Sequence, residues 1–118
     1  MEMFREVSAV YLHREPVDFR KAINGLSLIV EQEMSLSPFS GAVFVFCNRS
    51  RNKLKVLYWD RSGFALWYKR LEKEKFHWPR RWPEALVVLT EMQLHWLLDG
   101  YDITRMQAHH SLEYSSVL

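Results

Sequence analysis

The spacing of apolar residues in the first third of the chain predicts a strand and then a helix. A short β-type run, VYL, lies within residues 8–15, and Pro16 ends it. Apolar residues then recur at steps of three and four between residues 19 and 30, which is the period of one helix face. Asp18 is the expected N-cap of this helix, and the loop-forming stretch SLSPFSG, residues 35–41, is expected to follow its end.

The middle of the chain predicts a β-hairpin with a basic tip. The apolar run AVFVF, residues 42–46, has no polar alternation, which is typical of a strand buried on both faces. The run LKVLYW, residues 54–59, is its expected partner, so NRSRNK, residues 48–53, becomes the loop between them. Loop tips project charge into solvent, and we expect the three cations of this loop to lie at an exposed tip.

The next segment, FALWYKRLEKEK at residues 64–75, follows a DRSG turn and fits two structures. Helix is favoured because the run lacks β-branched residues and is rich in Leu, Lys, Arg and Glu, whereas a strand returning from the turn is the alternative. Further on, residues 76–79 and 85–89 predict two short strands, or one strand with an extended lead-in. A capping box at Thr90 opens the last predicted helix, and Gly100 is expected to end it.

These elements predict a single α+β domain over residues 1–102, with a small, mostly antiparallel sheet and about three helices. Residues 103–118 show no clear period and are expected to form a loosely ordered C-terminal tail. The chain has 118 residues, the size of one ordinary domain, and 48% of them are hydrophobic, which suffices for a core. The single cysteine, Cys47, excludes an internal disulfide. Because neither a long apolar window nor a secretory signal is visible, we expect a cytoplasmic protein with no membrane partner.

The net charge of +2 hides a strong asymmetry along the chain. Between Arg49 and Arg81 there are eleven basic residues and three acids, whereas the remainder of the chain has five basic residues and eleven acids. A basic middle with acidic flanks indicates a polyanionic partner. Aromatic residues interleave with these cations, and Trp78 and Trp82 are compatible either with core packing or with stacking on unpaired bases.

Catalytic chemistry has little support in the residues. Neither a Gly-rich phosphate loop nor a GxSxG nucleophile elbow is present. A small nuclease would need several carboxylates around metal ions, and Asp60 is the one acid beside the basic stretch that lies outside the predicted helix. The five histidines do not converge in sequence as a metal site requires. We therefore expect no enzymatic activity, no catalytic residues, no metal, no cofactor and no small-molecule substrate.

Three blocks of sequence carry a resemblance to a known family. They are VDFRKAINGL at residues 17–26, the stretch from PFSG to FHWP at residues 38–79, and LTEMQLHWLLDGYD at residues 89–102. This succession resembles the TnpB-type accessory proteins, also called second-open-reading-frame proteins, of insertion-sequence family sixty-six of bacterial transposable elements. The resemblance implies a protein encoded beside the large transposase and needed for movement of the element, with strand cutting left to the transposase.

The resemblance places the family's basic motif on Arg49, Lys55, Lys69 and Arg70. We therefore expect a basic surface that holds DNA, and in particular the ends of the element, through its phosphates. The predicted nucleic-acid-binding residues are Arg49, Arg51, Lys53, Lys55, Lys69, Arg70, Arg80 and Arg81. The alternative is a protein–protein adaptor, in which the same cations dock the transposase or another accessory protein and DNA is never contacted.

Overall fold

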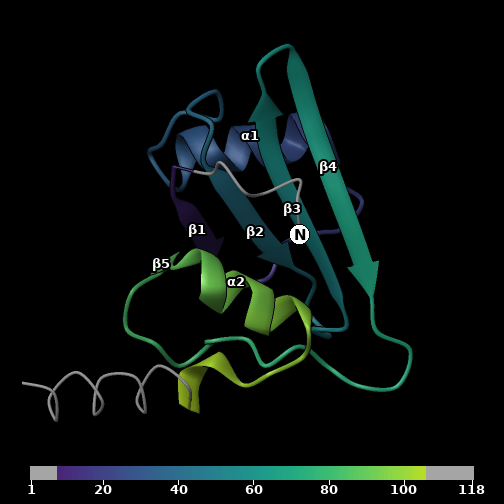
Figure 1. Ribbon diagram of the computed structural model, residues 1–118. Coiled ribbons are helices and arrows are strands. Elements are labelled where there is room, and N and C mark those ends of the chain that lie inside the picture. The colour runs from purple at the N-terminus through teal and green to yellow at the C-terminus, as the bar shows by residue number, and fades with distance from the viewer. Residues whose placement is uncertain (1–7, 106–118) are drawn as a thin grey trace, which may run out of the picture.

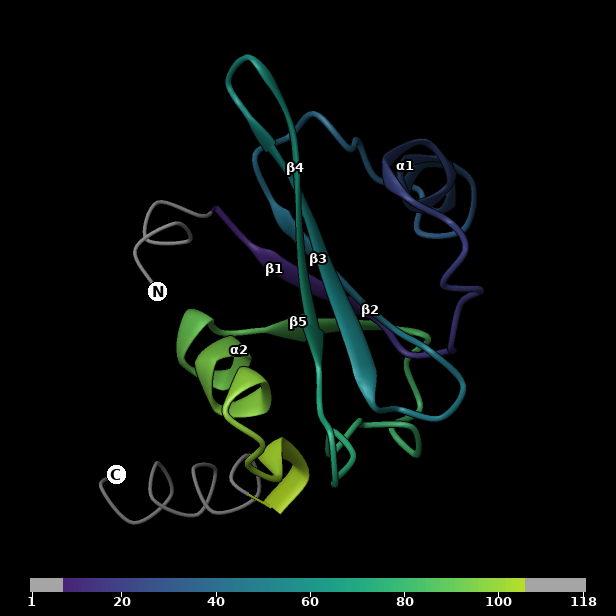
Figure 2. The ribbon, with the colours of Figure 1, turned by 90° about the vertical axis from the view of Figure 1, so that its right-hand side faces the viewer.

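The computed structural model describes residues 8–105 as a five-stranded sheet with one helix on each face (Figures 1 and 2). The strand order is β4-β3-β2-β1-β5, in which β1 and β2 are parallel and every other neighbouring pair is antiparallel. The elements are β1 (Val10–His13), α1 (Ile23–Gln32), β2 (Val43–Cys47), β3 (Lys53–Asp60), β4 (Gly63–Arg70), β5 (Leu86–Leu89) and α2 (Glu91–Leu98), and residues 103–105 are also helical. The predicted α+β class with a mostly antiparallel sheet is confirmed.

The helix α1 is the crossover that a parallel pair such as β1 and β2 requires. Its predicted N-cap, Asp18, is wrong, because α1 begins at Ile23 and its N-cap residue, Ala22, makes no side-chain capping bond. The carboxylate of Asp18 instead accepts hydrogen bonds from the backbone N–H and the guanidinium of Arg20. These bonds from Arg20 lower the pKa of Asp18 to about 2. An aspartate that closes a local turn competes with helix initiation, which explains the later start.

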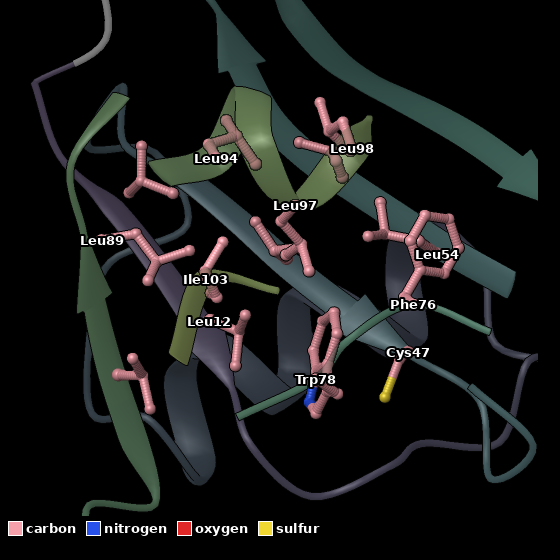
Figure 3. Close-up of a cluster of buried hydrophobic side chains, with 14 of the residues drawn as sticks. Leu12, Cys47, Leu54, Phe76, Trp78, Leu89, Leu94, Leu97, Leu98 and Ile103 are labelled. Carbon is pink, nitrogen blue, oxygen red and sulfur yellow. The ribbon is translucent and has the colours of Figure 1, made fainter. Parts of the chain in front are cut away.

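The two faces of the sheet bury separate hydrophobic clusters. On the face covered by α1, Leu26 and Val30 of the helix pack in one cluster with Phe44 and Phe46 of β2. On the other face, α2 packs Leu94, Leu97 and Leu98 over the sheet, as Figure 3 shows. All five residues of β2 are buried, which confirms the prediction of a strand covered on both faces.

The C-terminal part of the fold follows the predicted signals closely. The Thr90 hydroxyl accepts from the Gln93 backbone, and the Gln93 side chain accepts from the Thr90 backbone, so the capping box of α2 is confirmed. Gly100, with a φ of +91°, follows the end of the helix in the left-handed region that favours glycine. Ile103 is fully buried in the α2-face cluster, while residues 106–118 of the predicted tail lie outside the described residues.

The predicted helix over residues 64–75 is wrong, because residues 63–70 form the strand β4. The DRSG turn closes a hairpin in which Asp60 pairs with Gly63, and β4 then pairs with β3 over all eight of its residues. Its side chains alternate, so Phe64 and Leu66 pack in the α1-face cluster and Trp67 packs on the α2-face cluster. Hairpin pairing and burial on both faces override the helix propensity of this composition.

Of the two alternatives predicted for residues 76–89, two short strands or one strand with a lead-in, the structure has the single strand. Residues 86–89 form β5, at the edge of the sheet beside β1. Residues 76–79 form no strand, although Phe76 and Trp78 are buried beneath α2 in the α2-face cluster (Figure 3). This segment therefore contributes side chains to the core although its backbone forms neither a helix nor a strand.

Candidate nucleic-acid interface

The topology gathers most of the predicted basic residues at one end of the sheet. The C-terminal ends of β2 and β4 meet the N-terminal end of β3 there, at the lower end of the sheet in Figures 1 and 2. The loop 48–52 and the segment 71–82 extend from this end. We call it the basic end, and the predicted residues that lie in it are Arg49, Arg51, Lys53, Arg70, Arg80 and Arg81.

Side-chain amides hold the loop 48–52 in a defined shape. Oδ1 of Asn48 accepts from the backbone N–H groups of Asn52 and Lys53, both at 3.1 Å, and its Nδ2 donates to Oδ1 of Asn52 at 2.7 Å. Arg51 adopts a left-handed backbone with a φ of 59°. This geometry leaves Arg49 exposed at the tip, while Arg51 and Lys53 are half-buried beside it.

Backbone hydrogen bonds join this loop to the segment that follows β4. The N–H of Phe76 donates to the carbonyl oxygen of Arg51 at 2.7 Å, and the N–H of Leu71 donates to that of Asn52 at 2.8 Å. Two basic segments are therefore held side by side, although the residues that these bonds join are 19 and 25 positions apart in sequence. The basic residues of both segments therefore lie at the same end of the protein.

A groove of about 800 Å³ is lined by residues of these two segments and by Asp102 and Thr104, which follow α2. Four cations line it, Arg51, Lys75, Arg80 and Arg81, against two acids, Glu74 and Asp102. A concave surface with an excess of one charge concentrates counter-charged ligands more strongly than a flat one. The remaining lining residues are Phe76, His77, Trp78, Pro79, Trp82 and Thr104.

The aromatic residues of the groove belong to the core of the protein. Trp78 is buried, and its indole N–H donates to the carbonyl oxygen of Arg14 at 2.8 Å. The Arg14 guanidinium in turn donates to the carbonyl oxygens of Trp82 and Pro83. Trp82 is half-buried and packs against the α2-face cluster. The buried Trp78 side chain therefore packs beneath the groove and holds the backbone of its wall in place.

Asp102 is a fixed negative charge on one side of the groove. Its Oδ1 accepts hydrogen bonds from the hydroxyl and the backbone N–H of Thr104. These bonds, the hydroxyl above all, hold the pKa of Asp102 below its usual value. A phosphate in the groove would approach the arginines and Lys75 and avoid this side.

Lys55 is not part of the basic surface. Its side chain is buried, with 9% of its area exposed, and its Nζ donates to the carbonyl oxygens of Phe19 at 2.9 Å and Lys21 at 2.8 Å. The ammonium also lies 4.8 Å from the centroid of the Phe19 ring. Burial lowers the pKa of Lys55. A phosphate cannot reach an ammonium held in this way, so we remove Lys55 from the candidate interface.

Two further predicted cations have partners within the protein. Nζ of Lys69 donates to the carbonyl oxygen of Leu98 at 2.7 Å, at the C-terminus of α2. A cation there stabilises the negative end of the helix dipole, so Lys69 also leaves the candidate interface. The guanidinium of Arg70 is exposed and forms a salt bridge of 3.0 Å with Glu72. Lys53 lies opposite Arg70 in the pairing of β3 with β4.

Sequence reasoning missed Lys75 and His77, which line the groove. Lys75 lies in the alternating run EKEK, which looked like the solvated surface of a helix. The detectable signal was the density of prolines and aromatics in FHWPRRWP, which indicates a backbone fixed outside a helix or strand. A cation close to such a stretch is held in place more firmly than one on a helix surface.

An aromatic cluster occupies the opposite end of the β3–β4 hairpin. Phe39, from the PFSG stretch, lies 5.1 Å from Trp59 and 5.3 Å from Phe64, and these two rings lie 5.0 Å apart, all between centroids. Phe39 is 55% exposed, whereas Trp59 and Phe64 are half-buried. The motifs PFSG and YWDRSG, which both belong to the second block that carries the resemblance, therefore meet in space.

Residues 8–105 contain neither a cluster of metal-binding side chains nor a membrane-spanning helix. No three side chains of the His, Cys, Asp or Glu type lie close enough together in this range to hold a metal ion. None of the helices described has the length and apolar character to span a bilayer. Cys47 is a buried free thiol.

Comparison with known proteins gives a consistent family relationship. Residues 8–108 match the model of the family described as IS66 Orf2-like protein. The chain is 38% identical over 93 residues to the uncharacterized protein y4jC of Sinorhizobium fredii, a match that covers 79% of each chain. It is 36% identical over 93 residues to y4hO of the same organism, also uncharacterized, covering 79% of this chain and 80% of that one. No solved structure matches the chain.

Proposed function

The chain belongs to the IS66 Orf2-like family, and from this premise we propose that it is a non-catalytic accessory protein of transposition whose basic end binds DNA. Membership of the family supports the accessory role in movement of an insertion sequence. The DNA bound is that of the element's ends, and the strand-cutting chemistry belongs to the transposase that the protein assists.

One observation carries the proposal of DNA contact. Arg51, Lys75, Arg80 and Arg81 come from two distant segments, yet hydrogen bonds between those segments hold them around one groove, and Arg49 lies in the same loop as Arg51. Arg49, Lys75, Arg80 and Arg81 are exposed, and none of the salt bridges found among residues 8–105 involves any of the five. Cations that form none of these salt bridges and outnumber the acids at a concave surface fit a polyanion.

The kind of contact sets the expected specificity. Arginine and lysine neutralise phosphates, which fixes a protein on DNA and reads little sequence. Neither α1 nor α2 contributes a residue to the lining of the groove, so neither is placed there to read bases in the major groove of DNA. The protein therefore binds DNA with modest sequence preference, and selection of the element's ends is shared with the transposase.

Fluorescence anisotropy with a labelled duplex of the element's end tests this proposal. Neutralising about four phosphates gives a slope of log affinity against log salt of roughly −3.6. Arg81→Ala should weaken binding to all duplexes alike. Arg61→Asn is the matched control, because it removes one charge at the opposite end of the hairpin and asparagine tolerates the left-handed φ of 54° found there. Equal loss in both variants, or no binding at low salt, overturns the proposal.

A second candidate function is a protein–protein adaptor that docks the transposase without contacting DNA. The aromatic cluster of Phe39, Trp59 and Phe64 favours it, because aromatic residues are enriched in protein interfaces and Phe39 is more than half exposed. Phe39→Ser separates the two candidates in a pull-down with the element's own transposase. The adaptor function predicts loss of capture with DNA affinity unchanged, whereas unchanged capture contradicts it.

A further inference from the structure

Among residues 8–105, the strand β4 has one edge that pairs with no other strand. It is the last strand of the sheet, so β3 is its one strand neighbour within residues 8–105 (Figure 1). It has eight residues, which is longer than the five or so typical of strands, and all eight pair in register with β3 without a bulge. The other side of the strand carries a row of N–H and C=O groups that pair readily with another strand.

The usual protections against such pairing are missing from this edge. Natural edge strands are shortened, bulged, or guarded by proline and by charged side chains, lysine above all. The stretch FALWY at residues 64–68 has neither proline nor charge. Lys69 does not guard the edge, because its ammonium is bonded to the carbonyl oxygen of Leu98 on the α2 face. Arg70, the last residue of the strand, is the one outward residue with a charge, and it pairs with Glu72 at 3.0 Å.

The register of the hairpin decides which backbone groups point outward. The N–H of Leu71 donates to Asn52, so Leu71 points its backbone groups toward β3. Backbone direction alternates in an antiparallel pair, and the odd-numbered residues of β4 therefore point inward. The residues whose N–H and C=O groups point away from the sheet are Phe64, Leu66, Tyr68 and Arg70.

We propose that this edge is a dimerisation surface, on which β4 pairs antiparallel with β4 of a second copy of the chain. A two-fold axis perpendicular to the sheet keeps each face of one copy on the same side as that face in the other. The register that pairs all four outward residues places Leu66 opposite the second copy's Tyr68, and Phe64 opposite the second copy's Arg70. Each such pair exchanges two backbone hydrogen bonds.

The side chains favour a second copy in this orientation. Leu66 and Tyr68 give an apolar cross-strand pair, and Tyr68 is 48% exposed in the single chain, so it has area left to bury. The guanidinium of Arg70 reaches the face of the opposite Phe64, where a cation is attracted to the ring. Parallel pairing would instead place the Lys69-Arg70 ends of both copies side by side. Antiparallel pairing keeps these like charges at opposite ends of the ribbon.

Sedimentation velocity at about 1 to 100 µM, the range expected of a small interface, tests the proposal with the full chain. The expected result is a species of twice the 14.2 kDa chain mass at the upper concentrations. Tyr68→Pro removes one outward N–H without touching the β3 ladder and should return the chain to a monomer. Tyr68→Val is the matched control, since it shortens the same side chain and keeps the N–H.

Amide hydrogen exchange on the unmodified chain keeps the proposal testable if Tyr68→Pro does not fold. The N–H groups of Phe64, Leu66, Tyr68 and Arg70 should exchange about tenfold more slowly at high than at low concentration, because opening then requires dissociation. Those of Ala65, Trp67 and Lys69 face β3 and should change little. A monomer throughout the range, or a dimer in which the four outward amides still exchange rapidly, overturns the proposal.

Discussion

The side-chain nitrogen of Lys55 lies 2.9 Å from the carbonyl oxygen of Phe19 and donates a hydrogen bond to it. A second bond, of 2.8 Å, reaches the carbonyl oxygen of Lys21. The lysine therefore ties the turn that precedes α1 to the middle of the sheet. Lys55 lies in the basic motif that the family resemblance picks out, yet its role in this chain is to hold the fold.

Replacing Lys55 with methionine should destabilise the protein. Methionine keeps much of the volume but removes the donor, and two half-buried carbonyl groups lose a charged partner, which costs about 2 to 3 kcal/mol in the free energy of unfolding. Urea unfolding followed by circular dichroism measures this change. Lys53→Met, two residues away at the half-exposed start of β3, should change the same free energy by about 0.5 kcal/mol or less. Equal effects of the two substitutions would contradict the structural role.

Lys69 should contribute to stability and not to DNA affinity. Lys69→Met removes the hydrogen bond to Leu98 and a cation at the C-terminus of α2, at a cost of about 1 kcal/mol. The loss should appear in thermal unfolding and as faster amide exchange in the last turn of α2. The slope of log affinity against log salt should stay the same. A slope that falls by about one would show that Lys69 contacts phosphate after all.

Cys47 should be inert to thiol reagents in the folded protein. Burial raises the pKa of the Cys47 thiol to about 12, so almost no thiolate forms at pH 8, and the buried sulfur is also shielded from reagents. Modification with a chromogenic disulfide reagent should proceed only as fast as the chain unfolds, and completely in urea. Rapid stoichiometric labelling without denaturant is the result that this structure does not allow.

The ion pair of Asp18 with Arg20 should be visible in the acid titration. The pKa of Asp18 is about 2 against an ordinary value of 3.8, because Arg20 donates to its carboxylate. A lowered pKa in the folded state means a contribution to stability that is present above pH 3.8 and is lost as the pH falls through 2. NMR titration of the carboxyl carbon measures the pKa directly. Arg20→Gln should return it toward 3.8, and an unchanged value would rule out Arg20 as the cause.

The parts of the fold that could be predicted from sequence are those set by local chemistry. The buried strand β2 shows as an unbroken apolar run, and the capping box at Thr90 is closed by two residues three apart. The segment 64–70 was misread because its apolar residues fit a helix as well as a strand, and pairing with β3 decided between them. The burial of Lys55 depends on a turn 34 residues earlier in the chain, which no local pattern reveals.

In the candidate interface, too, the features set by local sequence were predictable and those set by contacts between distant segments were not. The loop 48–52 was predictable as a basic tip because it lies between two apolar runs. The groove was not predictable, since it forms only when Phe76 bonds to Arg51 and when the end of α2 packs nearby. Lys55 and Lys69 looked like surface cations in sequence, because nothing local distinguishes a lysine that reaches solvent from one that reaches a carbonyl oxygen.

The salt dependence of DNA binding in the double variant Arg49→Ala, Arg81→Ala is the most direct test of the central claim. Both side chains are exposed at the basic end and reach different parts of it, so the variant should lose about two phosphate contacts. The slope of log affinity against log salt should then change from roughly −3.6 to roughly −1.8, on element-end and scrambled duplexes alike. A slope that stays at the value of the unmodified protein would contradict DNA binding at the basic end.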